Sequence, residues 1–199
     1  MKKKLAGIIG TIIFIIILII DLNTDILKVK SYKKIKMNKV LLFFIVLGIL
    51  LVIEYIEDFI TYNYLDDYLK KDEDSKPGCI ENSYWDAILA GTSEEIIFRL
   101  IIFNFILIKL LKINVNHSII ISGILFGLIH INQYLSFGVN IYNTIAVIIQ
   151  AIPVGMLLAY IYVNTNLTTA IILHFIIDYS DFMLLRCNKS IYRKMLFIN

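Results

Sequence analysis

The sequence predicts an all-α protein, a polytopic transmembrane bundle of about six helices. Of its 199 residues 59% are hydrophobic, and the mean hydropathy is +0.79. Several apolar runs approach the length of roughly 20 residues with which a helix crosses about 30 Å of hydrocarbon. No polar segment between these runs is long enough to fold as a separate domain.

Each helix is expected where an apolar run lies between polar or charged residues. The runs predict helices at about 5–20, 40–53 with an amphipathic extension to 64, 84–111, 118–131, 141–163 and 167–185. Between the second and third runs, the polar stretch 66–81 contains Pro77 and Gly78, which predict a turn. We therefore divide the chain into two helices and a polar connector (1–83), a helical core that carries the candidate site (84–187) and a basic tail (188–199).

The basic residues indicate contact with membrane lipid. Lysines cluster at 2–4 and 28–39, on the flanks of apolar helices, and the net charge is only +3. Such clusters are typical of segments that face anionic headgroups, so we expect a lipid partner and no nucleic acid. The lysines and arginines divide almost evenly between the two predicted sides of the membrane, so their distribution does not determine the orientation of the protein in it. Because Cys79 and Cys187 are far apart and form no CxxC pair, neither a disulfide nor a thiolate zinc site is expected.

Three ionisable residues, Glu94, Glu95 and Arg99, lie in the middle of the run 84–111. A charge in the hydrocarbon costs roughly 2.5 to 3.5 kcal/mol on insertion scales, so such residues mark a functional site by default. Glu95 and Arg99 are four positions apart and share a helix face, which predicts an ion pair. Glu94 lies roughly 140° from Arg99 around the helix axis and needs another partner. The alternative for Glu94 is solvation at headgroup level.

Two histidines lie in other apolar runs. His130 closes the fourth run, either as a structural histidine or as a functional one. The small residues Ser122, Gly123 and Gly127 predict a close helix approach that brings His130 toward the third helix. His174 and Asp178 are four apart on the sixth helix. They form either a histidine oriented by its carboxylate or a polar pair that seals the bundle.

Other polar residues in the helices carry weaker signals. Gln150, close to Pro153 on the fifth helix, either bonds to the polar cluster or only packs. His117 lies beside Asn114 at a helix start and is assigned no role. No GxSxG or HExxH pattern is present. The simplest chemistry that glutamate and histidine share is activation of a water molecule.

The three motifs together resemble the CPBP family, which includes CAAX prenyl endopeptidases and Abi-type bacteriocin-immunity proteins. The resemblance rests on Glu94-Glu95-x3-Arg99, Phe126-x3-His130 and His174-x3-Asp178, in this order. It implies that Glu94 is a general base and that His130 holds the water. It also implies that His174 and Asp178 stabilise the oxyanion or complete the site, and that Glu95 and Arg99 are structural. The last position is often Asn in the family, and an ionised Asp178 cannot donate to an oxyanion.

The resulting expectation is an intramembrane endopeptidase of a bacterial cell membrane, with a peptide or a membrane-anchored protein as substrate. A mechanism without a cofactor is favoured. The alternative is Zn²⁺ held by Glu94, His130 and His174, because zinc sites commonly use three protein ligands and a water. Two other functions remain open: a non-catalytic immunity or regulatory protein of the same family, and a proton-coupled transporter. A transporter often shows internal repeats, and none is visible in this sequence.

Overall fold

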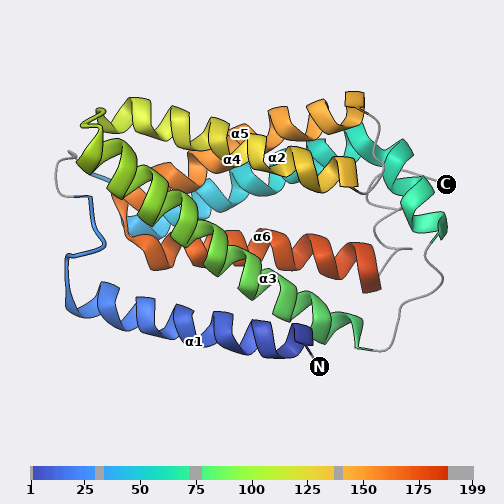
Figure 1. Ribbon diagram of the computed structural model, residues 1–199, viewed down its shortest axis with the longest axis horizontal. Coiled ribbons are helices and arrows are strands. Elements are labelled where there is room, and N and C mark those ends of the chain that lie inside the picture. The colour runs from blue at the N-terminus through green and yellow to red at the C-terminus, as the bar shows by residue number, and fades with distance from the viewer. Residues whose placement is uncertain (1, 30–33, 72–77, 137–140, 188–199) are drawn as a thin grey trace.

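The computed structural model describes residues 2–29, 34–71, 78–136 and 141–187, and these ranges are helical apart from short connections. Figure 1 shows most helices running roughly along the long axis of the molecule, with α3 crossing the view diagonally. Their bounds are α1 (Lys2–Asn23), α2 (Lys39–Lys71), α3 (Cys79–Glu95), η1 (Ile96–Leu110), α4 (Val115–Ser136), α5 (Ile141–Asn164) and α6 (Leu167–Cys187). Since η1 continues α3 without a break, the two together form one helix. The described residues therefore form the predicted all-α bundle of six helices.

The helix boundaries differ most around the polar connector. The second helix, α2, continues to Lys71 and so takes up part of the stretch in which we expected a connector. The predicted turn is confirmed at Gly78, whose φ of 80° is left-handed and favours glycine. The third helix then starts directly at Cys79, earlier than the predicted 84. The expected basic tail, 188–199, lies outside the described residues.

The helices run back and forth between two ends of the bundle (Figure 1). One end, which we call the lysine end, holds the described connecting residues 24–29, 34–38, 111–114 and 165–166. Tyr162 donates to the carbonyl of Leu27 at 2.5 Å, and Ile35 N donates to Asn164 at 3.0 Å. These bonds hold the α1–α2 connection against the end of α5. The opposite end carries the starts of α1 and α3 and the end of α6.

Apolar residues cover the outside of the described bundle as well as its inside. Among the described residues, three helices are long and apolar enough to cross a membrane, over Lys4–Asn23, Lys39–Phe59 and Leu167–Leu184. Val115–Ile131 and Ile148–Asn164 are shorter apolar segments. Many isoleucines of α1 and α2 are exposed, for example Ile12 at 53%. A protein with such a surface is stable in lipid, and the chain is an integral membrane protein.

The close packing of α4 belongs to α5 rather than to the third helix, which corrects our expectation. A Cβ added to Gly123 would lie 2.4 Å from a side-chain carbon of Met156, and one on Gly127 would lie 2.8 Å from the carbonyl of Ile148. From the α5 side, Gly155 meets Phe126 in the same way, at 2.7 Å. The glycines thus let the α4 and α5 backbones approach, as small residues do in membrane bundles.

A disulfide joins Cys79 to Cys187, and our expectation that these cysteines would not pair was wrong. The two Cα atoms are 5.7 Å apart, although 108 positions separate them in the sequence. The reason is topological, because α3 starts and α6 ends at the same end of the bundle (Figure 1). The disulfide therefore ties together the two helices that carry most of the predicted site.

Candidate active site

Glu95 and Arg99 form the predicted ion pair, and both side chains are fully buried. Arg99 Nε lies 2.8 Å from Glu95 Oε2, and Arg99 Nη2 lies 3.1 Å from Glu95 Oε1. Two parallel contacts of this kind are the strongest geometry that a guanidinium and a carboxylate can adopt. The prediction of a pair at this four-residue spacing is confirmed.

The helix changes its hydrogen-bond pattern immediately after Glu95. From Ile96 to Leu110 it is a π-helix, and at its end Leu111 N donates to Ile106 O at 2.9 Å. Such i→i+5 segments are rare and are usually single turns near functional sites. The sequence did not predict this change. The π-helix therefore begins directly after Glu94 and Glu95.

Helix α4 completes the surroundings of Arg99. Arg99 Nη1 donates to Ser122 Oγ at 3.1 Å, and the guanidinium carbon lies 5.4 Å from the ring centre of Phe126. Ser122 Oγ in turn lies 3.5 Å from the carbonyl oxygen of Phe98. A buried cation is tolerated when its donors are satisfied in this way. Ser122 is thus the small residue of α4 that faces η1.

His174 of α6 is held by Glu95. Its Nδ1 lies 3.0 Å from Glu95 Oε1, and the residue is only 3% exposed. A carboxylate can only accept, so Nδ1 carries the proton in this bond. The other ring nitrogen, Nε2, lies 3.5 Å from Asp178 Oδ1 and 3.8 Å from Glu94 Oε2. The sequence offered Asp178 as the carboxylate that orients His174, but Glu95 makes the shorter contact.

Glu94 points away from Arg99, as its position on the helix predicted. Its closest ionic partner among the described residues is His174, at 3.8 Å. Glu94 Oε2 is buried and has no hydrogen-bond partner within the described part of the chain, although the side chain as a whole is 31% exposed. This geometry leaves one carboxylate oxygen available beside a fixed histidine.

One acidic residue near the site was missed by the sequence analysis. Glu54 of α2 lies close enough to Asp178 and His174 to interact electrostatically with both. It lies outside the three motifs, but a glutamate directly after the run 40–53, within the membrane-length segment Lys39–Phe59, was a signal of the same kind as Glu94. The site therefore has three carboxylates around His174 on the motif helices, and a further one on α2.

His130 contacts the other site residues only through the ring of Phe126 among the described residues. Its Nδ1 lies 2.7 Å from the carbonyl oxygen of Phe126, and its ring centre lies 5.0 Å from that of Phe126. The Phe126 ring is also 5.7 Å from the His174 ring. No ion pair or hydrogen bond between His130 and Glu94 is found among the described residues. Within the same part of the chain, no three His, Cys, Asp or Glu side chains are grouped closely enough to hold a metal ion.

Within the described part of the chain, neither Gln150 nor His117 is bonded to this cluster. The Oε1 atom of Gln150 is buried without a hydrogen-bond partner among the residues described, so no bond to the site is seen. His117 is exposed and bonded to Asn114, in agreement with its lack of an assigned role.

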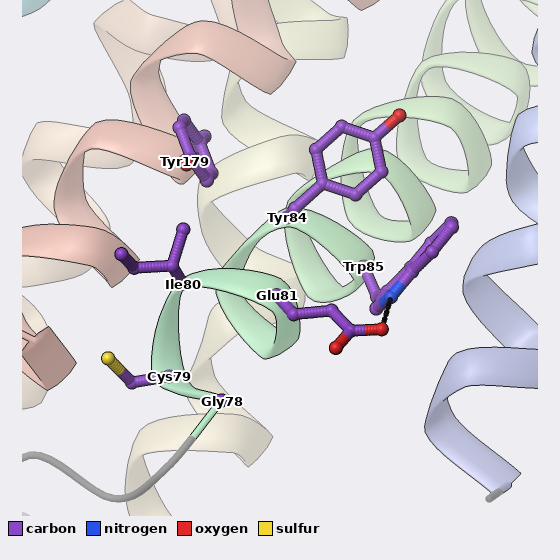
Figure 2. Close-up of a pocket in the computed structure, with 7 residues that line it drawn as sticks. All are labelled: Gly78, Cys79, Ile80, Glu81, Tyr84, Trp85 and Tyr179. Atoms are coloured by element: carbon purple, nitrogen blue, oxygen red, sulfur yellow. Dashed lines mark hydrogen bonds between the residues drawn. The ribbon is translucent and has the colours of Figure 1, made fainter.

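A hollow of about 520 Å³ near the disulfide contains none of the predicted catalytic residues. Tyr84, Trp85 and Tyr179 line it together with Glu81, which accepts a bond from Trp85 Nε1 at 3.2 Å (Figure 2). Glu81 also pairs with Lys4 at 2.7 Å, and hydrogen bonds from Lys4 and Trp85 lower the pKa of this exposed carboxyl. Tyrosine and tryptophan beside charged residues are typical of the boundary between lipid and water.

Comparison with known families identifies the family to which this chain belongs. Residues 80–180 match the family model described as type II CAAX prenyl endopeptidase Rce1-like. The match covers α3, η1, α4, α5 and most of α6, and so includes all six predicted site residues. The chain belongs to this family of intramembrane proteases. No curated protein and no solved structure matched the chain.

Proposed function

We propose that the protein is an intramembrane endopeptidase that hydrolyses a peptide bond with a water molecule activated by Glu94. The observation that carries the proposal is the buried, unbonded Oε2 of Glu94, 3.8 Å from the Nε2 of a histidine held in place by Glu95. A general base needs an oxygen that is free to accept a proton and a neighbour that controls its position. Family membership supports this assignment.

The other residues have distinct roles in this mechanism. When both ring nitrogens of His174 are protonated, Nε2 donates to the oxyanion that forms on the attacked carbonyl, while Glu95 keeps the ring in place. His130 holds the water with Nε2, because its Nδ1 is bonded to Phe126. Asp178 Oδ1, 3.5 Å from His174 Nε2, stabilises the doubly protonated ring by its charge. The favoured mechanism uses no cofactor, and the substrate is a peptide or a membrane-anchored protein cleaved near its anchored end.

A non-catalytic immunity or regulatory protein of the same family is the second candidate. The observation that favours it is the position of His130, which makes no direct contact with Glu94 within the described residues. Such a protein binds its partner without turnover. Conservative replacement of Glu94 distinguishes the two candidates.

The test is hydrolysis by the purified protein, in detergent and in lipid nanodiscs, of a prenylated peptide and of a peptide library. Glu94→Gln keeps the shape of the side chain but removes the base, so turnover should fall by about 10² to 10⁴. Glu81→Gln is the matched control, because Glu81 is an exposed glutamate on the same helix. Equal turnover by the parent and Glu94→Gln contradicts the general-base role. A complete lack of hydrolysis by the parent favours the non-catalytic candidate.

A further inference from the structure

A second pocket, separate from the predicted catalytic residues, lies at the lysine end. Its volume is about 350 Å³, and it lies between the start of α2 and the start of α6. The lining includes a cation, two aromatic rings and three hydroxyl or amide side chains, namely Lys39, Phe43, Phe44, Thr165, Asn166 and Thr169. The pocket is therefore polar on one side and apolar on the other.

On the polar side, two groups among the described residues are left with free donors, the Lys39 ammonium and the Asn166 amide nitrogen. Asn166 Oδ1 already accepts bonds from Thr169 N at 3.0 Å and from Thr169 Oγ1 at 2.6 Å, so its amide nitrogen is left to donate. Thr165 Oγ1 uses its proton on the carbonyl of Ile161 at 2.6 Å, so this hydroxyl, like that of Thr169, donates nothing to a ligand. No carboxylate in the described part of the chain pairs with Lys39. An ammonium and an amide that both lack acceptors favour an anion.

The charge around the pocket leads to the same conclusion. Lys34 lies in the connector outside the spanning segments, and its pKa is lowered by partial burial and then by repulsion from Lys39 and Lys28. Asp25 is the one nearby group that raises it, and Asp25 is paired with Lys28 at 2.5 Å. Positive charge is therefore in excess beside the pocket, and a bound anion relieves the repulsion.

The apolar side identifies the kind of anion. Lys39 is the first residue of the apolar segment Lys39–Phe59, so it lies at the membrane boundary, and Phe43 and Phe44 lie about one turn deeper. The two rings pack edge to face at 5.4 Å, and Phe44 is 61% exposed. A free phosphate has no apolar part that could pack on these rings, whereas a phospholipid can pack an acyl chain against them.

We propose that this pocket is a binding site for an anionic phospholipid. Its phosphate contacts Lys39 and the Asn166 amide, and one acyl chain lies along Phe43 and Phe44. Basic pockets between transmembrane helices bind acidic headgroups in this way. The bound lipid contacts α2 and the start of α6, which carries His174 further along. The site does not depend on the peptidase proposal, since it shares no residue with the predicted catalytic set.

The experiment is native mass spectrometry of the purified full chain, in detergent with equal amounts of phosphatidylglycerol and phosphatidylcholine. The parent should retain phosphatidylglycerol preferentially. Lys39→Gln should weaken this retention about fivefold, the equivalent of about 1 kcal/mol for one lysine near the membrane surface. Lys109→Gln is the matched control, because Lys109 is exposed at the same end but does not line the pocket. It should retain phosphatidylglycerol like the parent.

Two further measurements separate the possible ligands. Phe44→Ala should weaken retention of phosphatidylglycerol while leaving the response to inorganic phosphate unchanged. Displacement of phosphatidylglycerol by millimolar inorganic phosphate alone would overturn the lipid assignment in favour of a free anion. Equal retention of the two lipids by the parent also overturns the proposal, and this comparison needs no variant. Equal loss of phosphatidylglycerol in Lys39→Gln and Lys109→Gln shows unspecific attraction and overturns it as well.

Discussion

Glu95 Oε1 lies 3.0 Å from His174 Nδ1, so the carboxylate that neutralises Arg99 also holds the histidine of the predicted site. The contacts continue from Arg99 to Ser122 at 3.1 Å, which links α4 through η1 and α3 to α6. Because Nδ1 is bonded to Glu95, Nε2 is the ring nitrogen that faces Glu94. The Glu95–Arg99 pair is therefore positioned to control the orientation of His174 as well as the stability of the helix pair.

Arg99→Ala should destabilise the protein and reduce its activity. The change leaves the buried Glu95 without its cation, and breaking a buried pair costs about 3 to 5 kcal/mol. The measurement is thermal unfolding in detergent, with the exposed Lys109→Ala as control. If Arg99→Ala melts at the temperature of the parent, the pair does not stabilise the fold.

Asp178→Asn should keep activity equal to or above that of the parent. The Asp178 contact to His174 Nε2, at 3.5 Å, is longer than the Glu95 contact, so the ring stays oriented without it. The amide also supplies a donor that an ionised carboxylate lacks. Steady-state hydrolysis of the peptide substrate tests this, and a large loss of turnover in Asp178→Asn would show that the carboxylate itself is required.

Chelators should leave hydrolysis unchanged. We expect this because Glu94 and His174 approach each other while His130 stays behind Phe126, so the three proposed zinc ligands are not grouped. The measurement is activity after EDTA or phenanthroline, together with elemental analysis of the purified protein. Loss of activity that zinc restores, with about one zinc per chain, would establish the metal mechanism instead.

Cys79→Ser should lower the thermal stability of the oxidised protein and leave the reduced protein unchanged. A disulfide that closes a long loop contributes about 2 to 4 kcal/mol, and this one spans 108 positions. Melting curves with and without reductant provide the measurement. A parent that melts identically in both conditions shows that the disulfide adds no stability.

The disulfide also predicts the membrane orientation. Disulfides persist in oxidising compartments, so the end with Cys79 and Cys187 should face away from the cytoplasm and the lysine end should face it. Single cysteines introduced at Lys109 and at Glu81, in a Cys79→Ser, Cys187→Ser background, can be labelled in intact cells with an impermeant maleimide. Labelling at position 81 alone is expected, and labelling at position 109 alone shows the opposite orientation.

Local sequence patterns were sufficient to predict much of the site. The spacing between Glu95 and Arg99 predicted the ion pair, and the angle between Glu94 and Arg99 predicted that Glu94 points elsewhere. Both are relations within one helix, where the side-chain direction follows from the helical repeat. The apolar runs likewise predicted the helices, since only helices and closed barrels satisfy the backbone in lipid.

Relations between helices could not be predicted in the same way. Patterns along the chain predicted an all-α membrane bundle and the residue types of the candidate site. They did not predict that Glu95 contacts His174, that the Phe126 ring packs against both histidines or that Cys79 pairs with Cys187. The physical reason is that helical periodicity specifies which face a residue occupies. Which helix covers that face depends on packing, here on the glycines that bring α4 against α5 and on the antiparallel pairing of α3 with α6.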